Sequence, residues 1–289
     1  MSEQLPGVPE TLEPLVVRVL AGNASPYTYT GTQTYLVGAS DLAVIDPGPE
    51  DAAHLQAMLA VIAGRPLRAI VITHTHRDHS PGARALHAAT GAPIIGCAPL
   101  ALDDNAPRAD ASFDHDYAPD RILADGEFIS GVGWTLTAIA TPGHTSNHLC
   151  FALPETGALF SGDHVMGWST SIVSPPDGDM GDYIRSLEKL QSRDDRIYYP
   201  GHGDPVDNPK RLVRGMIGHR KQREGQILRL LREKPRGVPA MVERMYVGID
   251  PRLFPAAERS VLAHLIDLAQ RGLAMAEGDI WSPLAEANV

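Results

Sequence analysis

The chain has 289 residues and carries 35 acidic against 25 basic residues, a formal net charge of −10, which disfavours a polyanionic partner because like charges repel. Hydrophobic residues make up 43% of the sequence and charged residues 21%, a composition that excludes extensive disorder and, at this length, suits two domains. The two cysteines, Cys97 and Cys150, are too few for a disulfide framework, so we expect a reducing, cytoplasmic location.

The N-terminal part of the sequence predicts a meander of strands. Residues 1–10 have neither a basic start nor an apolar run, so they lack the pattern of a signal peptide. No segment has the roughly 20 apolar residues that span a bilayer, and we expect no membrane association. Short β-branched and aliphatic runs at 15–20, 34–37 and 42–45 are separated by Gly, Pro, Asn and Ser and predict strands.

Strands and single helices alternate in the middle of the chain. Residues 52–63 have the apolar spacing of a helix, and 67–73 form the continuous apolar run of a buried strand. Ser80 and Pro81 have the pattern of an N-cap and a first helical residue, for a helix that ends near Gly91. Further strands are expected at 93–97, within 128–140, at 149–153 and at 159–161, and a helix at 180–190. This mixture predicts an α+β protein in which two packed sheets carry helices outside.

The character of the sequence changes after Pro205. Helices are expected at 209–233, 239–247 and 256–271, followed by a short hairpin at 273–281. Three helices and a hairpin are the order of a winged helix, which binds nucleic acid in some proteins and only packs or dimerises in others. We expect a catalytic domain at residues 1–207 and a small winged-helix-like domain at 208–289, and the sequence predicts no particular oligomeric state.

The segment from Lys210 to Arg236 has a charge opposite to that of the rest of the chain. It contains ten basic and two acidic residues, a net charge of +8, so the remaining residues together carry −18. A run of this kind fits either a nucleic-acid backbone or an ordinary solvated helix face. Both interpretations stay open at this point.

The most informative segment is THTHRDH at residues 73–79, at the end of a predicted buried strand. Side chains alternate along an extended backbone, so His74 and His76 point to one face, and Asp78 and His79 follow in the turn. Neutral imidazoles and carboxylates are the ligands that catalytic zinc uses. Three histidines and one aspartate within six residues therefore predict ligands for two neighbouring metal ions rather than an ordinary polar loop.

Three later strand ends carry further candidate ligands. His144 follows Thr-Pro-Gly, Asp163 follows Phe-Ser-Gly, and His202 follows Tyr-Tyr-Pro-Gly. Each segment is an apolar strand, a small turn and a ligand, and the two oxygens of a carboxylate such as Asp163 can bridge two cations. Because loops on a rigid scaffold build active sites in this way, we expect seven ligands at one edge of the sheets.

The motif H-x-H-x-D-H at residues 74–79, with the later ligands in order, resembles the metallo-β-lactamase superfamily over roughly residues 15–205. The resemblance implies a four-layer αββα fold and two zinc ions per chain, with iron or manganese as the alternatives. It also implies the distribution of the ligands: His74, His76 and His144 for the first zinc, Asp78, His79 and His202 for the second, and Asp163 bridging both.

Four more residues are expected around this centre. Asp46, in Val-Ile-Asp-Pro-Gly, resembles the early aspartate of the family, which orients the ligands. His148 begins a strand four residues after His144, and we interpret it as a buried, hydrogen-bonded support of that loop. His164 is expected to approach the site, and Trp168 to line the substrate pocket.

Within the superfamily, the chain resembles the β-lactamase-like protein 2 subgroup, which joins this fold to a C-terminal winged-helix-like domain. The resemblance rests on GTQTYLVG at 31–38, YPGHG at 199–203 and HRKQRE at 219–224. Members of the subgroup include endoribonucleases that prefer single strands. Seven aspartates between Asp103 and Asp125, with few basic residues around them, count against a polyanionic substrate.

These observations predict a binuclear zinc hydrolase. A hydroxide that bridges the metals would attack a carbonyl or phosphorus, and Asp78 would assist protonation of the leaving group. A phosphodiester, including single-stranded RNA bound through Lys210 to Arg236, is the first expected substrate. A small-molecule thioester or another carboxylic ester or amide, including a β-lactam, is the alternative. A mononuclear iron sulfur dioxygenase on His74, His76 and His144 is a third reading, which metal content separates from the others.

Overall fold

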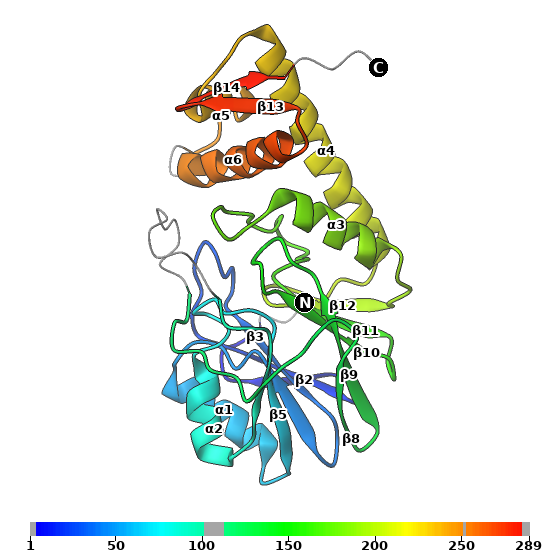
Figure 1. The fold of residues 1–289 in the computed structure, drawn as a ribbon. Helices are drawn as coiled ribbons and strands as arrows, with labels where there is room; N and C mark the ends of the chain where they lie inside the picture. The colour runs from blue at the N-terminus through cyan, green and yellow to red at the C-terminus, as the bar shows by residue number, and fades with distance from the viewer. Residues whose placement is uncertain (1–3, 101–112, 251–252, 285–289) are drawn as a thin grey trace.

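Two β-sheets form the centre of the first two thirds of the chain (Figure 1). The computed structural model describes residues 4–100, 113–250 and 253–284. The first sheet has the strand order β1 (Pro9–Glu13), β2 (Val16–Leu20), β3 (Gln33–Val37), β4 (Leu42–Ile45), β5 (Leu67–Ile72), β6 (Ile94–Gly96) and β7 (Arg121–Ile122). The second has the order β12 (Ile197–Pro200), β11 (Ala158–Gly162), β10 (Leu149–Leu153), β9 (Trp134–Ala140) and β8 (Phe128–Gly131).

The first sheet changes from antiparallel to parallel pairing at β4. Strands β1 to β4 pair antiparallel, whereas β4 to β7 pair in parallel. Strands β2 to β4 are those of the predicted meander, and β1 is an additional strand that was not predicted. Parallel neighbours need a crossover, and α1 (Ala52–Ile62) and α2 (Gly82–Thr90) supply two of them. Both helices lie on the outer face of this sheet (Figure 1).

The start of α2 differs from the prediction. The N-cap is Pro81 and no side chain caps the helix, so the expectation that Ser80 caps it was wrong. The Ser80 hydroxyl instead donates to Asp114 Oδ2 at 2.9 Å. A hydroxyl has one hydrogen to donate, and here it links the metal-motif segment to a distant loop.

The two sheets face each other across an apolar core. In β10, Leu149, Phe151 and Leu153 belong to this core, whereas Cys150 and Ala152 pack with α3 (Met180–Gln191) on the other side. The alternation follows from the two-residue period of a strand, and it makes β10 buried on both faces. Helices, two sheets and helices again form four layers, and the predicted αββα architecture is confirmed.

The last part of the chain is a helical unit with a hairpin. It comprises α4 (Pro209–Glu233), α5 (Val238–Met245), α6 (Phe254–Gln270), β13 (Ala274–Glu277) and β14 (Ile280–Pro283). Met241, Leu265 and Trp281 pack in its separate core, and the predicted winged-helix order is confirmed. None of the helices in the described residues combines the length and apolarity that crossing a membrane requires.

Helix α4 belongs to both parts of the molecule. Its 25 residues extend about 37 Å at 1.5 Å per residue. Val213 and Ile217 near its start pack with α3 and the second sheet, whereas Ile227 and Leu231 near its end pack in the core of the C-terminal unit. The predicted division between residues 207 and 208 therefore falls just before a helix that the two cores share.

Candidate metal centre

The seven predicted ligands lie at one edge, where strands of both sheets end. Residues 73–79 follow β5, His144 follows β9, Asp163 follows β11 and His202 follows β12. Backbone hydrogen bonds join the two sheets here, because Leu149 N donates to Thr73 O at 2.8 Å and Gln33 N donates to Gly201 O at 2.8 Å. The structure thus brings together strand ends that are far apart in the sequence.

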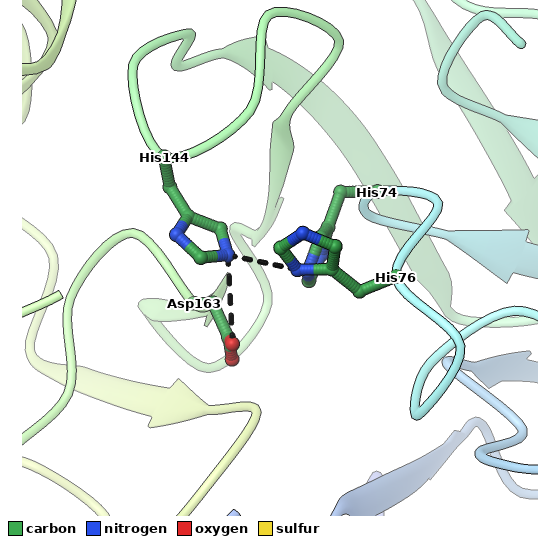
Figure 2. Close-up of side chains that lie close together, drawn as sticks. All are labelled: His74, His76, His144 and Asp163. Carbon is green, nitrogen blue, oxygen red and sulfur yellow. Dashed lines mark hydrogen bonds and ion pairs between the residues drawn. The ribbon is translucent and has the colours of Figure 1, made fainter. Parts of the chain in front are cut away.

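Four of these side chains form a first cluster, which Figure 2 shows. One ligand atom from each of His74, His76, His144 and Asp163 lies within 4.8 Å of the others. His76 Nδ1 is 3.0 Å from His74 Nε2 and 3.1 Å from His144 Nε2. Asp163 Oδ2 lies 3.7 Å from His144 Nε2. The four side chains point into one small space from three different loops (Figure 2).

The remaining three ligands form a second cluster beside the first. His202 Nε2 lies 3.1 Å from Asp78 Oδ2 and 3.3 Å from His79 Nε2. Asp163 is shared, because its Oδ1 is 3.4 Å from His79 Nε2 and its Oδ2 is 3.4 Å from His202 Nε2. Its carboxylate therefore lies between the two clusters.

Asp46 and Thr73 determine the tautomers of two ligands. Thr73 donates its one hydroxyl hydrogen to Asp46 Oδ2 at 2.7 Å, so at the 2.9 Å contact between Thr73 Oγ1 and His74 Nδ1 the imidazole is the donor. His79 Nδ1 likewise donates to Asp46 Oδ2 at 2.9 Å. In both histidines the other nitrogen, Nε2, then presents a lone pair to the cluster, which is how a carboxylate orients metal-binding imidazoles.

Backbone carbonyls orient two more ligands in the same way. His144 Nδ1 donates to Ile172 O at 2.6 Å, and His202 Nδ1 donates to Gly31 O at 3.1 Å. The Nε2 atoms of both histidines are therefore unprotonated in the neutral tautomer and point at the clusters. A carbonyl oxygen cannot donate, so this assignment follows from geometry alone.

The electrostatics separate the two clusters. Burial, together with the neighbouring imidazoles, lowers the pKa of His74 well below its ordinary value and the pKa of His76 to about 3. Burial also opposes the charged form of His202, but Asp163 and Asp78 outweigh it and raise its pKa to about 9. Carboxylates raise the pKa of His79 in the same way. His74 and His76 in the first cluster are therefore neutral at about pH 7, whereas the second cluster attracts positive charge.

The donor atoms fit divalent cations. Imidazole nitrogens and two carboxylates face one another at short range in both clusters, and Asp163 Oδ1 is buried without a hydrogen-bond partner. A cation in each cluster would satisfy these atoms, and nitrogen and oxygen donors in this number are those of a catalytic zinc site. Asp46 also lies near His74 and His79, but its oxygens already accept from Thr73 and His79, so it orients ligands rather than binding metal.

Comparison with known families places this centre. The Metallo-beta-lactamase superfamily model matches residues 27–202, and the Beta-lactamase associated winged helix domain model matches residues 238–281. The first match covers more than half of the chain and includes every predicted ligand. The chain belongs to the metallo-β-lactamase superfamily. It is a metal-dependent hydrolase of this superfamily, and the expected resemblance to members with a winged-helix domain is confirmed.

Several known proteins are similar to this chain over most of their own length. The chain is 31% identical over 271 residues to the Beta-lactamase-like protein 2 homolog of Drosophila melanogaster, covering 89% of this chain and 88% of that protein. It is 34% identical over 239 residues to the Atrochrysone carboxyl ACP thioesterase of Aspergillus fumigatus, covering 78% and 69%. A Beta-lactamase domain protein from Burkholderia ambifaria has the same fold, with a TM-score of 0.81 at 20% identity over 98% of this chain and 96% of that one.

In this superfamily member, His148 lies beneath the first cluster. It is buried, its Nδ1 is 2.9 Å from Thr141 Oγ1, and its Nε2 accepts a hydrogen bond from Asp163 N at 3.3 Å. The approach is close, because a Cβ added to Gly162 would lie 2.6 Å from His148 Nε2. This geometry supports the proposed role of His148 in holding the Asp163 loop.

His164 and Trp168 lie around the centre rather than in it. The His164 ring packs against Tyr183 at 4.8 Å and His148 at 5.8 Å. Trp168 stacks on Tyr29 at 4.9 Å and an interplanar angle of 13°. With residues 166–170 and the start of α4, Trp168 lines a groove of about 630 Å³.

Some contributors to the site were not predicted from the sequence. For Thr73 a signal exists, because a hydroxyl directly before the first histidine can link that histidine to a carboxylate, here Asp46. Ile172 and Gly31 act through their carbonyls, which every residue has. The most hidden contributor is Arg220, a buried member of the basic run that donates to Ser171 O at 2.5 Å.

The aspartates between Asp103 and Asp125 turn out to be partly structural. Asp103, Asp104 and Asp110 lie outside the described residues. Of the others, Asp114 accepts from Ser80 and pairs with Arg84, Asp120 accepts from Ile94 N, and Asp125 pairs with Lys189. Because these three carboxylates are already engaged, they weigh less against an anionic substrate than their number implies.

Proposed function

We propose that the chain is a binuclear zinc hydrolase that cleaves thioesters. The observation that carries the proposal is the position of the Asp163 carboxylate between two clusters of imidazole and carboxylate groups, within 3.4 to 3.7 Å of His79, His144 and His202. Two zinc ions bound there would supply Lewis acidity toward the substrate and lower the pKa of a water nucleophile. The other steps are assigned to residues of the chain.

Asp78 is the residue to which we assign proton transfer. Its side chain is 26% exposed, against 9% for Asp163, so it is the carboxylate that a substrate reaches more easily. Burial would raise the pKa of Asp78, but His79 and His202 lower it below its ordinary value. Asp78 is therefore a carboxylate at neutral pH, which can accept a proton from water but has none of its own to donate.

The protonation state of Asp78 bears on which leaving group the site can release. A thiol has a pKa of about 8.5, so a thiolate departs near neutral pH with little help from an acid. An alkoxide leaving group needs a proton or strong charge stabilisation. Asp78 is anionic before the reaction, so the only proton it can pass to the leaving group is the one it has taken from water. A thiolate departs without that proton, so a thioester makes a smaller demand on this site than an ordinary ester. The similarity to proteins named as ACP thioesterases points the same way.

The second candidate substrate is a phosphodiester, including single-stranded RNA. It is favoured by the winged-helix unit and by the basic run on α4. However, several of the ten basic side chains are already engaged. Lys210, Lys221 and Arg236 pair with carboxylates. Arg220 and Arg223 donate hydrogen bonds to backbone carbonyls. A continuous track for a phosphate backbone is thus interrupted, which places this candidate second.

A substrate panel with defined metal content tests the proposal. Metal content and sulfur oxidation are measured first on the chain as purified. The chain is then stripped with a chelator, reloaded with zinc, and assayed with acetyl, hexanoyl and benzoyl thioesters, a bis-phosphodiester dye, single-stranded RNA and a chromogenic cephalosporin. We expect about two zinc equivalents per chain and the highest kcat/KM on a thioester, abolished by His76→Ala. Faster cleavage of RNA would establish the second candidate, and one equivalent of iron with sulfur oxidation would establish the dioxygenase instead.

The compartment is also a proposal. Cys97 and Cys150 are both free and buried, and buried free thiols are typical of proteins in a reducing environment. We infer a cytoplasmic location.

A further inference from the structure

A groove of about 630 Å³ opens beside the metal centre, between residues 166–170 and the first half of α4. Its walls are continuations of the ligand loops, because Met166 comes three residues after Asp163 and Pro205 three residues after His202. Trp168, one of the lining residues, lies against the loop that carries His202. A Cβ added to Gly203, the residue after His202, would lie 2.9 Å from Trp168 Cδ1. A substrate held at the metal centre therefore has this groove within reach of its next segment.

We propose that the groove binds the phosphopantetheine arm on the thiol side of the substrate, presented by an acyl carrier protein. The inference rests on the proposed thioesterase function and names the class of its substrate. A phosphopantetheine arm is a linear chain with a dimethyl-substituted carbon, two amides and one phosphodiester at its far end. A complementary groove therefore needs apolar walls, a few polar groups and one site for an anion.

The lining of the groove matches this chemistry. Met166, Trp168, Leu212 and Met216 provide apolar and aromatic surface, and Asn208 provides an amide that can bond to the amides of the arm. Small-molecule sites combine mainly apolar walls with a few polar groups in this way. The groove is open to solvent along α4, so a chain can lie in it while its end stays attached to a carrier.

The anion site is supplied by two arginines on α4. Arg211 lines the groove, and Arg214 follows three residues later on the same face of the helix. Among the described residues neither guanidinium forms an ion pair, whereas the neighbouring Lys210 pairs with Asp194. Two exposed arginines one helical turn apart can place their guanidinium groups on a single phosphate. Coenzyme A carries three phosphates and a carrier-borne arm carries one, which is why we assign the carrier protein.

Gly215 keeps the groove open. Glycine inside a helix is destabilising relative to alanine, yet α4 has Gly215 and, one turn later, Gly218. A Cβ at either position would meet no atom within 4 Å, so both accept larger side chains without a clash at the first carbon. Gly215 lines the groove, whereas Gly218 is exposed outside it. The two glycines form a matched pair for an experiment.

The test compares binding of an acyl carrier protein with and without its arm. For the wild-type chain loaded with zinc, we expect the holo carrier to bind at least about tenfold more tightly than the apo carrier, as measured by calorimetric titration. Gly215→Leu is expected to remove that difference, because the leucine fills the groove, and Gly218→Leu is expected to keep it. Arg211→Glu combined with Arg214→Glu is expected to weaken holo binding by about tenfold or more. Equal binding of holo and apo carrier by the wild type would overturn the assignment.

Hydrolysis gives a second, separate measure. With one acyl group, we expect kcat/KM to be higher on the carrier thioester than on the coenzyme A thioester, and Gly215→Leu to cause a greater loss on the carrier thioester than on the short N-acetylcysteamine thioester. A preference for coenzyme A would overturn the carrier assignment. Absence of all thioester hydrolysis would refute the proposed function, and the binding titration would still decide whether the groove holds the arm.

Discussion

At the scale of single residues, Asp46 fixes the direction in which two ligands present their lone pairs. It accepts hydrogen bonds from Thr73 N, Thr73 Oγ1 and His79 Nδ1. Through the Thr73 hydroxyl it also fixes the tautomer of His74. Its backbone has a φ of 49°, a conformation that aspartate adopts more readily than most residues. One carboxylate outside the clusters thus governs one ligand of each.

Replacing Asp46 should weaken metal binding without removing a ligand. In Asp46→Asn, one acceptor oxygen becomes an amide donor, so either Thr73 or His79 loses its partner and the imidazole orientation is released. We expect zinc affinity to fall by about 10- to 100-fold, as measured by competition with a chromophoric chelator. Asp207→Asn, at an exposed position with the same change of charge, is the control and should bind zinc like the wild type. An affinity equal to that of the control would show that Asp46 does not orient the ligands.

The second cluster should exchange protons for metal. In the metal-free chain, carboxylates raise the pKa of His202 to about 9, and that of His79 is also raised, so both imidazoles carry protons at about pH 7. Zinc needs their lone pairs and must displace these protons, so its affinity should increase as pH rises toward the pKa of His202. Calorimetry in buffers of different ionisation enthalpy should count about two imidazole protons released, and about one fewer for His202→Gln. An affinity independent of pH would contradict this assignment.

The sequence predicted much of this site at the residue scale, because the ligands share a local signature. Each predicted ligand follows an apolar strand and a short turn, and all seven lie at one edge of the sheets. Hydrogen bonds that set the tautomers could not be predicted in the same way. They depend on which carbonyl lies opposite an imidazole nitrogen, as Ile172 O does for His144, and that is a property of the folded loops rather than of residue type.

At the scale of elements, the end of β11 is the most tightly constrained part of the site. Gly162 ends this strand with a φ of 48°, and its Cα faces His148 at a distance that leaves no room for a Cβ. The close approach brings Asp163 N within 3.3 Å of His148 Nε2. The glycine at the end of β11 and the histidine directly before the neighbouring strand β10 together fix the carboxylate shared by the two clusters.

Gly162→Ala should therefore lower the free energy of unfolding by more than the strain of a positive φ alone would. Its Cβ would lie 2.6 Å from His148 Nε2, so the strand end or the imidazole has to move. We expect the free energy of unfolding to fall by roughly 2–4 kcal/mol, as measured by urea denaturation, together with weaker zinc binding. Gly64→Ala separates the two causes, because its φ is 74° but a Cβ there meets nothing within 4 Å, and it should cost only about 1–2 kcal/mol. Equal losses for both variants would show that the contact with His148 is unimportant.

At the scale of the whole molecule, α4 ties the C-terminal unit to the metal centre. Arg220 is buried, donates to Ser171 O at 2.5 Å and lies over the ring of Tyr183 at 5.1 Å. The next residue, Ile172, accepts the hydrogen bond of His144 Nδ1. The loop that orients a ligand of the first cluster is thus held from the helix that begins the C-terminal unit.

This coupling also explains why the domain organisation was harder to read from the sequence than the ligands were. Apolar periodicity showed that 209–233 is a helix with one buried face, but it could not show that the face packs on two different cores. The two matching family models leave the whole of α4 between them. In the same way, the charge of the basic run gave no sign that Arg220 points inward while Arg211 and Arg214 stay outside.

Replacing Arg220 should therefore change how tightly the metal centre holds zinc. In Arg220→Met, the aliphatic volume over Tyr183 is largely kept, but Ser171 O loses its buried donor and the loop that carries Ile172 is released. We expect the free energy of unfolding to fall by about 1–3 kcal/mol and zinc to dissociate faster from the first cluster than from the second, as followed with a chelator in stopped flow. Arg229→Met, on an exposed position of the same helix, should change neither quantity. If Arg220→Met lowers stability but leaves both dissociation rates at wild-type values, the arginine serves the packing of α4 alone. A change confined to the first cluster would instead show that the C-terminal unit positions His144, since Ser171 and Ile172 are the residues through which Arg220 reaches it.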